Sequence, residues 1–226
     1  MYKFLFLDLD DTLLDFGAAE DVAIRRTFRE VGIEPTEKLI ARYKQINAAQ
    51  WQRYERGEIP RAQVLTERYD LLFAEFGIHM PGWKCEDVYR KYLGIGHYFV
   101  PGAVELLDYL RGRGYRLFLA SNGVAATQNS RLDSAGIRPY FEDIFISETT
   151  GSHKPDRRYF DYCFSHISGF EKDAALLIGD SLSSDIRGGK NAGIHTCWFN
   201  PGGRTAPPEL QPDYQISSLV ELHRIL

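Results

Sequence analysis

The sequence has no long hydrophobic run. Its longest apolar stretches, such as residues 4–7 and 174–178, are only a handful of residues long, whereas a membrane-spanning helix needs about 20. The first stretch follows a single Lys and ends at Asp8. It is too short for a secretory signal peptide, and an acidic residue follows it too early. We therefore expect no membrane partner and a cytoplasmic chain.

Cysteine is scarce as well. The three cysteines, Cys85, Cys163 and Cys197, are odd in number, far apart and without CxxC spacing. We expect them to be reduced core residues, which agrees with a cytoplasmic setting.

The sequence also lacks a run of basic residues. Its 27 Lys and Arg stand against 31 Asp and Glu, which gives a net charge of −4. Nucleic-acid binding depends on neutralising many phosphates, so this balance predicts no nucleic-acid partner. A local pocket can still be positive and hold a small anion.

The composition is that of an ordinary folded chain. Hydrophobic residues make up 44% and charged residues 26% of the 226 positions, which argues against collagen, coiled-coil and disordered classes. The length fits one domain with an insertion or two small domains.

Short apolar segments alternate with helical patterns. Apolar runs occupy residues 3–8, 115–121, 144–147 and 174–180, with a possible fifth at 195–199. Continuous apolar runs indicate strands that helices cover on both faces. Helical spacing follows at residues 104–110, 124–135 and 159–167. The alternation predicts an α/β fold: a Rossmann-like parallel sheet with helices on both faces.

The strand pattern disappears between Asp15 and about Tyr98. Several helical patterns follow one another there, separated by glycines. We expect a catalytic core formed by residues 1–15 and 99–226 and an inserted all-helical cap at 16–98. Some polar aromatic residues of this block are candidates to face the site, although packing within the block is the simpler explanation for each: Trp51, Tyr54, Tyr92, His97 and Tyr98. Gly17, Gly94 and Gly96 are candidate hinges for closure of the cap.

Polar side chains cluster where the apolar strands end. Ligands of open α/β sheets bind at the carboxyl ends of the strands. Each residue alone also fits a capped turn, a β-turn or a solvated lysine, but together they favour a common site. The residues are Asp8, Asp10, Thr12, Ser121, Asn122, Gly123, Lys154 and Asp180.

The carboxylates of Asp8, Asp10 and Asp180 would repel one another at a common site without a cation. Oxygen ligands favour Mg²⁺, which often shares one or two carboxylates with a phosphate substrate. A phosphate ester is therefore the expected guest. Lys154 offers charge, Ser121 a hydroxyl, and the amides near Gly123 an anion-binding turn.

Four segments resemble, in order and placement, the motifs of the haloacid dehalogenase superfamily. They are FLDLDDTLL at 6–14, SNG at 121–123, HKPD at 153–156 and GDSLSSD at 179–185. The match spans the whole chain, and the helical block stands where one subgroup carries its cap. Further runs at 8–16, 186–194 and 196–201 are similar to the pyrimidine nucleotide 5′-nucleotidase branch, which is associated with noncanonical nucleotides.

The resemblance implies a role for each residue. Asp8 is the expected nucleophile, giving an aspartyl-phosphate, and Asp10 the expected general acid and base. The other expected roles are these: Thr12 holds Asp10 and lies in the phosphate-binding group with Ser121, Asn122 and Lys154; Asp8, the Asp10 carbonyl and Asp180 bind Mg²⁺; Asp185 holds a metal-bound water or Lys154, or is the N-terminal acid of a helix.

Two positions discriminate within the superfamily. Dehalogenases lack a carboxylate two residues after the nucleophile, because a halide needs no proton. Asp10 therefore favours phosphoryl chemistry. Asp11 replaces the superfamily's common glycine, a departure that the nucleotidase-like branch shares and that disfavours mutase and phosphoglycolate activities.

The sequence thus predicts a Mg²⁺-dependent phosphomonoesterase that hydrolyses nucleoside 5′-monophosphates, in particular pyrimidine and noncanonical ones. Within the same chemistry, a sugar phosphate or phosphoglycolate is the alternative substrate. A phosphotransferase that passes the phosphoryl group to a second acceptor is a further alternative. From another class, a non-catalytic phosphometabolite-binding protein is possible. Nothing in the sequence indicates an oligomeric state.

Overall fold

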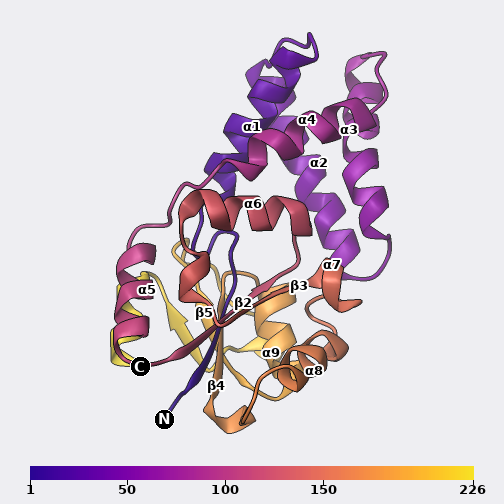
Figure 1. The fold of residues 1–226 in the computed structure, drawn as a ribbon. Coiled ribbons are helices and arrows are strands. Elements are labelled where there is room, and N and C mark those ends of the chain that lie inside the picture. The colour runs from indigo at the N-terminus through magenta and orange to yellow at the C-terminus, as the bar shows by residue number, and fades with distance from the viewer. The chain divides into compact units, whose positions relative to one another are not determined.

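A six-stranded sheet is the centre of the fold (Figure 1). The structure is a computed structural model, and it describes residues 1–226. The strand order is β3-β2-β1-β4-β5-β6, and every neighbouring pair is parallel. The strands are β1 (Phe4–Leu7), β2 (Arg116–Ser121), β3 (Asp143–Ile146), β4 (Ala175–Gly179), β5 (His195–Phe199) and β6 (Tyr214–Ile216).

Helices cover both faces of this sheet. They are α5 (Ala103–Gly112), α6 (Ala125–Ala135), α7 (Ser147–Thr150), α8 (Arg157–Ser165) and α9 (Arg187–Ala192), with the short turns η1 (Arg138–Tyr140), η2 (Lys172–Ala174), η3 (Leu182–Ile186), η4 (Pro208–Leu210) and η5 (Leu219–Arg224). The α/β prediction is confirmed, including the fifth strand. The edge strand β6 was not predicted, because its Tyr-Gln-Ile sequence is too short to show a pattern.

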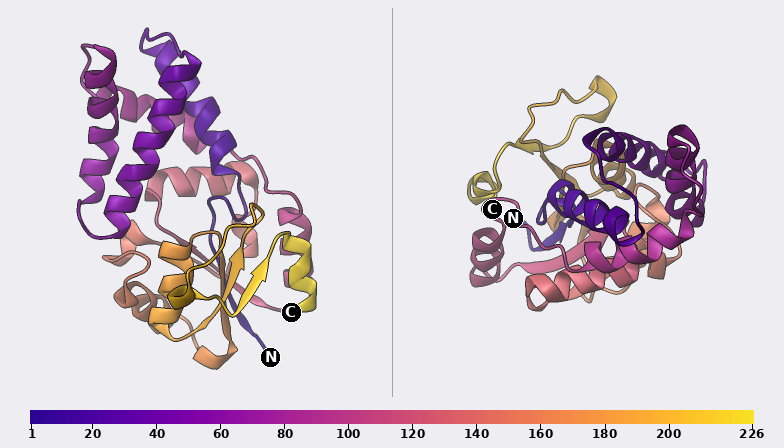
Figure 2. Two further views of the ribbon diagram at one scale, coloured as in Figure 1. Left: turned by 180° about the vertical axis from the view of Figure 1, so that it is seen from behind. Right: turned by 90° about the horizontal axis from the view of Figure 1, so that it is seen from above.

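Successive residues of β1 enter two different cores, as the period of two in a strand requires. Leu5 and Leu7 pack with α5 and η5, whereas Phe4 and Phe6 pack with α8. All four are fully buried. Burial on both faces explains why the strand is a continuous apolar run. Figure 2 shows the yellow C-terminal turn η5 beside α5, which agrees with their packing in one core.

The chain divides into two compact units, Met1–Phe16 with His97–Leu226 and Gly17–Gly96. The second unit holds nearly all of α1 (Phe16–Glu30) and the helices α2 (Glu37–Glu55), α3 (Arg61–Phe76) and α4 (Trp83–Gly94). Gly17 and Gly96, two of the candidate hinges, are its first and last residues.

The helical unit has an aromatic core around one buried cation. Arg68 lies over the rings of Tyr43, Tyr69 and Tyr89, 4.8–5.9 Å from the ring centroids. Its guanidinium also pairs with the buried carboxylate of Glu86. A buried charge is tolerated when it is paired in this way.

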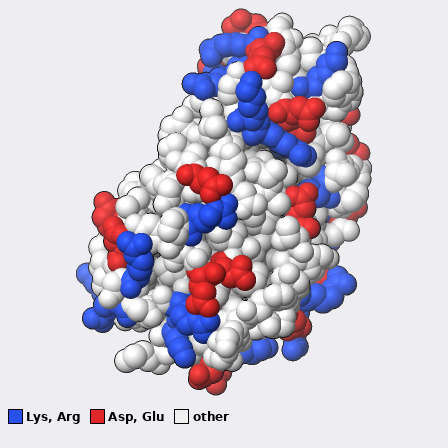
Figure 3. Space-filling model, in the orientation of Figure 1, with Lys and Arg blue, Asp and Glu red and all other residues white.

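Charges of both signs are interspersed on the face that Figure 3 shows. In Figure 3, blue Lys and Arg side chains alternate with red Asp and Glu side chains instead of gathering by sign. Arg42 and Glu75, for example, form an ion pair of 2.6 Å. None of the helices combines the length and the hydropathy that crossing a bilayer requires.

Candidate active site

The register of the sheet brings the first two carboxylates together. Leu7 of β1 pairs with Ile178 of β4, so Asp8 and Asp180 follow neighbouring strands at the same edge. β1 has β2 on one side and β4 on the other, so the strand order runs outward from β1 in opposite directions. Ligands of open α/β sheets usually bind at such a point. Asp8 is 7% exposed.

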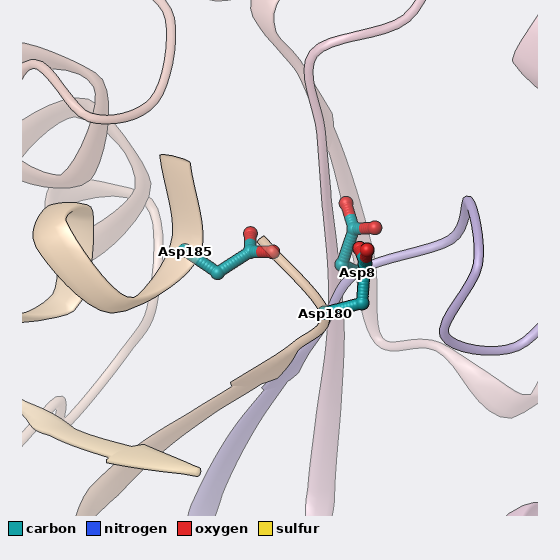
Figure 4. Close-up of side chains that lie close together, drawn as sticks. All are labelled: Asp8, Asp180 and Asp185. Atoms are coloured by element: carbon teal, nitrogen blue, oxygen red, sulfur yellow. The ribbon is translucent and has the colours of Figure 1, made fainter. Parts of the chain in front are cut away.

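A third carboxylate reaches this edge from the turn after β4. Asp185 is in η3, where its Oδ2 accepts a hydrogen bond from the backbone N–H of Ser181 at 3.0 Å. Figure 4 shows its carboxylate directed toward those of Asp8 and Asp180. One carboxylate oxygen from each of the three residues lies within 4.8 Å of the others.

Gly179 makes this approach possible. A Cβ atom at this position would collide with the carboxylate of Asp185. The glycine of the GDSLSSD motif therefore has a steric role at the site.

Lys154 lies between two of these carboxylates. Its Nζ donates to Asp8 Oδ1 at 2.7 Å, to Asp185 Oδ1 at 2.6 Å and to the Ala120 carbonyl at 2.6 Å. All three ammonium protons are used, and the side chain is 1% exposed. Lys154 is therefore a buried and fully hydrogen-bonded residue of the site and not a solvated surface lysine.

The surroundings shift the pKa values of these groups. Burial raises the pKa of Asp8 well above its usual range, against the opposing effect of Lys154. Burial and the nearby Asp185 raise the pKa of Asp180 to about 8. For Lys154, burial acts to lower the pKa, but the carboxylates of Asp185 and Asp8 outweigh it and the pKa is raised.

The Ser-Asn-Gly turn after β2 is tied to the lysine loop. The Asn122 amide donates to the Lys154 carbonyl at 2.8 Å, and its oxygen accepts from the Lys154 N–H at 2.9 Å. Asn122 was expected to bind phosphate; here its side chain holds the backbone of Lys154. Ser121 Oγ accepts from Gly123 N–H at 3.1 Å.

Two residues of α6 hold the Asp10 side chain. Gln128 donates to its Oδ2 at 2.7 Å, and Arg131 forms an ion pair with its Oδ1. Thr12 was expected to hold Asp10, but its buried hydroxyl makes no hydrogen bond in the structure. The Arg131 guanidinium and the Gln128 amide hold the Asp10 carboxylate instead of Thr12.

Two pairs of residues at the site were not predicted from the sequence. Gln128 and Arg131 are buried polar side chains three residues apart on α6. Trp198 and Arg204 both donate to the Asp180 carbonyl at 2.8 Å. The three-residue spacing of Gln128 and Arg131 within a helical pattern was visible in the sequence, but their burial was not. The Arg204 contact depends on the path of a loop.

The donor set fits a hard divalent cation. Three carboxylates converge, and only one ammonium lies among them. Burial raises the pKa values of Asp8 and Asp180, and a bound cation would favour the ionised form of both carboxylates. An all-oxygen set is the one that Mg²⁺ prefers.

The candidate residues of the helical block have varied surroundings. Tyr54 is buried, and its ring contacts Trp51 edge to face. The Tyr92 hydroxyl bonds to Glu30. His97 and Tyr98 are exposed, and the His97 ring contacts Ser134 Oγ at 3.1 Å.

Comparison with known proteins places the chain in a family. Residues 5–199 match the model of haloacid dehalogenase-like hydrolases. The chain therefore belongs to the haloacid dehalogenase-like hydrolase family, and the resemblance inferred from the motifs is confirmed. The expectation of a hydrolase is confirmed with it.

One relative is similar to this chain over nearly its whole length. The chain is 42% identical to the HAD-hydrolase YfnB of Bacillus subtilis, over all of this chain and 95% of the relative. A crystal structure of YfnB bound to magnesium, which is described as revealing interdomain movement, superposes with a TM-score of 0.95 and covers 100% of this chain and 98% of the other.

Two relatives are named for an activity. Pyrimidine 5′-nucleotidase PynA of Streptococcus pneumoniae is 40% identical over 98% of this chain and 93% of its own length. Pyrimidine 5′-nucleotidase YjjG of Escherichia coli is 32% identical over 100% and 98%.

Proposed function

We propose that this protein is a Mg²⁺-dependent phosphomonoesterase that hydrolyses pyrimidine nucleoside 5′-monophosphates through an aspartyl-phosphate. The observation that carries the proposal is the buried constellation at the sheet edge: Asp8, Asp180 and Asp185 with Lys154 among them. Relatives at 40% and 32% identity that are named pyrimidine 5′-nucleotidases support the substrate class.

Asp8 is the nucleophile in this mechanism. Its carboxylate oxygen attacks phosphorus in line, the P–O bond to the alcohol breaks, and an aspartyl-phosphate forms. Lys154 donates to Asp8 Oδ1, which leaves the second oxygen for the attack. The buried ammonium also offsets negative charge on the transferring group.

Asp10 serves both halves of the reaction. It protonates the leaving alcohol oxygen and then takes a proton from the water that hydrolyses the aspartyl-phosphate. Ser121 and the turn after it offer donors to the phosphoryl oxygens. Asn122 acts indirectly, by fixing the loop that carries Lys154.

Asp8, the Asp10 carbonyl and Asp180 would hold the Mg²⁺, with Asp185 beside them. When bound, the ion neutralises charge on the phosphate and orients it for attack. The magnesium-bound structure of the relative YfnB supports the choice of ion. Trp198 and Arg204 fix the backbone of Asp180 for the same purpose.

The helical unit is proposed to act as a cap that sets specificity, because in this mechanism the residues at the sheet edge would contact only phosphate and metal. Gly17 and Gly96, at its two limits, would serve as hinges. The interdomain movement described for YfnB supports such a motion.

The test is phosphate release with Mg²⁺ from a panel of esters: pyrimidine and purine nucleoside monophosphates, sugar phosphates and phosphoglycolate. We expect dUMP, UMP or dTMP to give the highest kcat/KM, and Asp8→Asn to lose activity by at least about a thousandfold. Ser130→Ala, an exposed change elsewhere in the same unit, is the matched control. A sugar phosphate in first place would reject the substrate class, and an active Asp8→Asn would reject the mechanism.

A further inference from the structure

Asp10 has polar partners on both of its carboxylate oxygens. Arg131 Nη1 pairs with Oδ1, and Gln128 Nε2 donates to Oδ2 at 2.7 Å. The two partners also contact each other, since Arg131 Nη1 donates to Gln128 Oε1 at 3.1 Å. The carboxylate thus has a defined orientation although about a third of its side chain is exposed.

Both partners come from one face of α6. Residues three apart in a helix lie on the same side, and Gln128 and Arg131 are 2% and 0% exposed. A buried guanidinium is costly unless it is paired. Asp10 is the partner that offsets this cost, so the arginine and the carboxylate are held in one arrangement.

Gln128 also connects Asp10 to the turn after β2. Its Nε2 donates to Ser121 Oγ at 2.9 Å as well as to Asp10. The backbone leaves room for this arrangement, because a Cβ on Gly123 would lie 2.5 Å from Gln128 Nε2. The glycine of the Ser-Asn-Gly turn therefore allows the amide to reach both residues.

We propose that Gln128 and Arg131 are positioning residues that aim the carboxylate of Asp10 during catalysis and set it relative to Ser121. The inference rests on the proposed function, in which Asp10 is the general acid and base. A general acid must meet its proton acceptor within hydrogen-bond distance. Small errors of placement in such groups cost large factors in rate.

The experiment is a double-mutant cycle on kcat/KM, which reports the steps up to the first phosphoryl transfer. Arg131→Met, Asp10→Asn and the double variant are compared on the phosphate ester that the wild-type enzyme hydrolyses best. If Arg131 acts through Asp10, Arg131→Met lowers kcat/KM by about tenfold or more in the wild-type background and by less than about threefold in the Asp10→Asn background. Equal losses in both backgrounds would overturn the proposal.

Two controls keep the result interpretable. Ser130→Ala, exposed on the same helix, should leave kcat/KM within about twofold of wild type. Should Arg131→Met fail to fold, the same cycle is run with Gln128→Met, which keeps the volume and removes all three hydrogen bonds of the amide.

The outcomes separate the two proposals. If the wild type hydrolyses no ester of the panel, the proposed function fails and this inference fails with it. If the wild type is active, Asp8→Asn is inactive and Arg131→Met costs the same with and without Asp10, only the positioning role is rejected.

Discussion

Charge at the site is divided between two acidic residues with different partners. Asp8 shares a buried ammonium with Asp185, whereas Asp10 pairs with a guanidinium from α6. In the proposed function, one carboxylate attacks and the other transfers protons. Two chemically equal side chains, two residues apart, thus have different surroundings.

This division predicts that the effect of Asp10 depends on the leaving group. Asp10→Asn should lower kcat/KM on a nucleoside 5′-monophosphate by about 10²–10³-fold, because the alkoxide needs a proton. On p-nitrophenyl phosphate the loss should be under about tenfold, since a nitrophenolate leaves without one. Steady-state kinetics on the two esters checks this. An equal loss on both would contradict the role of Asp10 as general acid.

At the scale of elements, the turn after β1 depends on an unusual backbone conformation. Asp11 has a φ of +56°, and it is the one residue other than glycine with positive φ. Its Oδ1 accepts a hydrogen bond from the Phe16 N–H at 2.9 Å, where α1 begins. Glycine adopts this conformation without strain, whereas the hydrogen bond to Phe16 N–H accounts for an aspartate here.

Substitutions at Asp11 should therefore differ in their cost. Asp11→Val places a β-branched residue in the left-handed region and removes the hydrogen bond to α1, which should lower the free energy of unfolding by about 2 kcal/mol. Asp11→Asn keeps both features and should cost less than about 0.5 kcal/mol. Urea denaturation of the two variants measures the difference. Similar midpoints would show that neither feature matters.

At the scale of the whole molecule, folding gathers carboxylates that repel one another. Burial, with Asp185 nearby, raises the pKa of Asp180 from 3.8 to about 8. Because the folded pKa is the higher one, the folded chain binds this proton more tightly than the unfolded chain. The contribution of Asp180 to stability is therefore complete below about pH 4 and is lost as the pH rises toward about 8.

A divalent cation should reverse this loss. Mg²⁺ binds the ionised carboxylate, so its stabilising effect should grow between about pH 5 and about pH 8. A ligand at 100 times its Kd adds about 2.7 kcal/mol. Thermal unfolding with and without Mg²⁺ measures the effect, and EDTA should abolish it. An increase in Tm that is the same at both pH values, or that persists in Asp180→Asn, would argue against this cluster as the binding site.

Much of this molecule could be predicted from local pattern. Apolar runs such as that ending at Leu7 are buried on both faces by a parallel sheet, so they predict strands directly. Asp8, Asp180 and Lys154 could be placed in one site because each follows a strand and parallel strands end at one edge. β6 could not, because three residues are too few to show a period.

The sequence by itself determined the class of fold, the family and the residues at the ends of the strands, since these depend on patterns of neighbouring residues. Only the tertiary structure decided which partner each polar group has. Asp10 faces Arg131 and not Thr12, and Asn122 bonds the backbone of Lys154. These pairings join residues 32 to 121 positions apart. They depend on how helices and loops pack against the sheet, which no local spacing encodes.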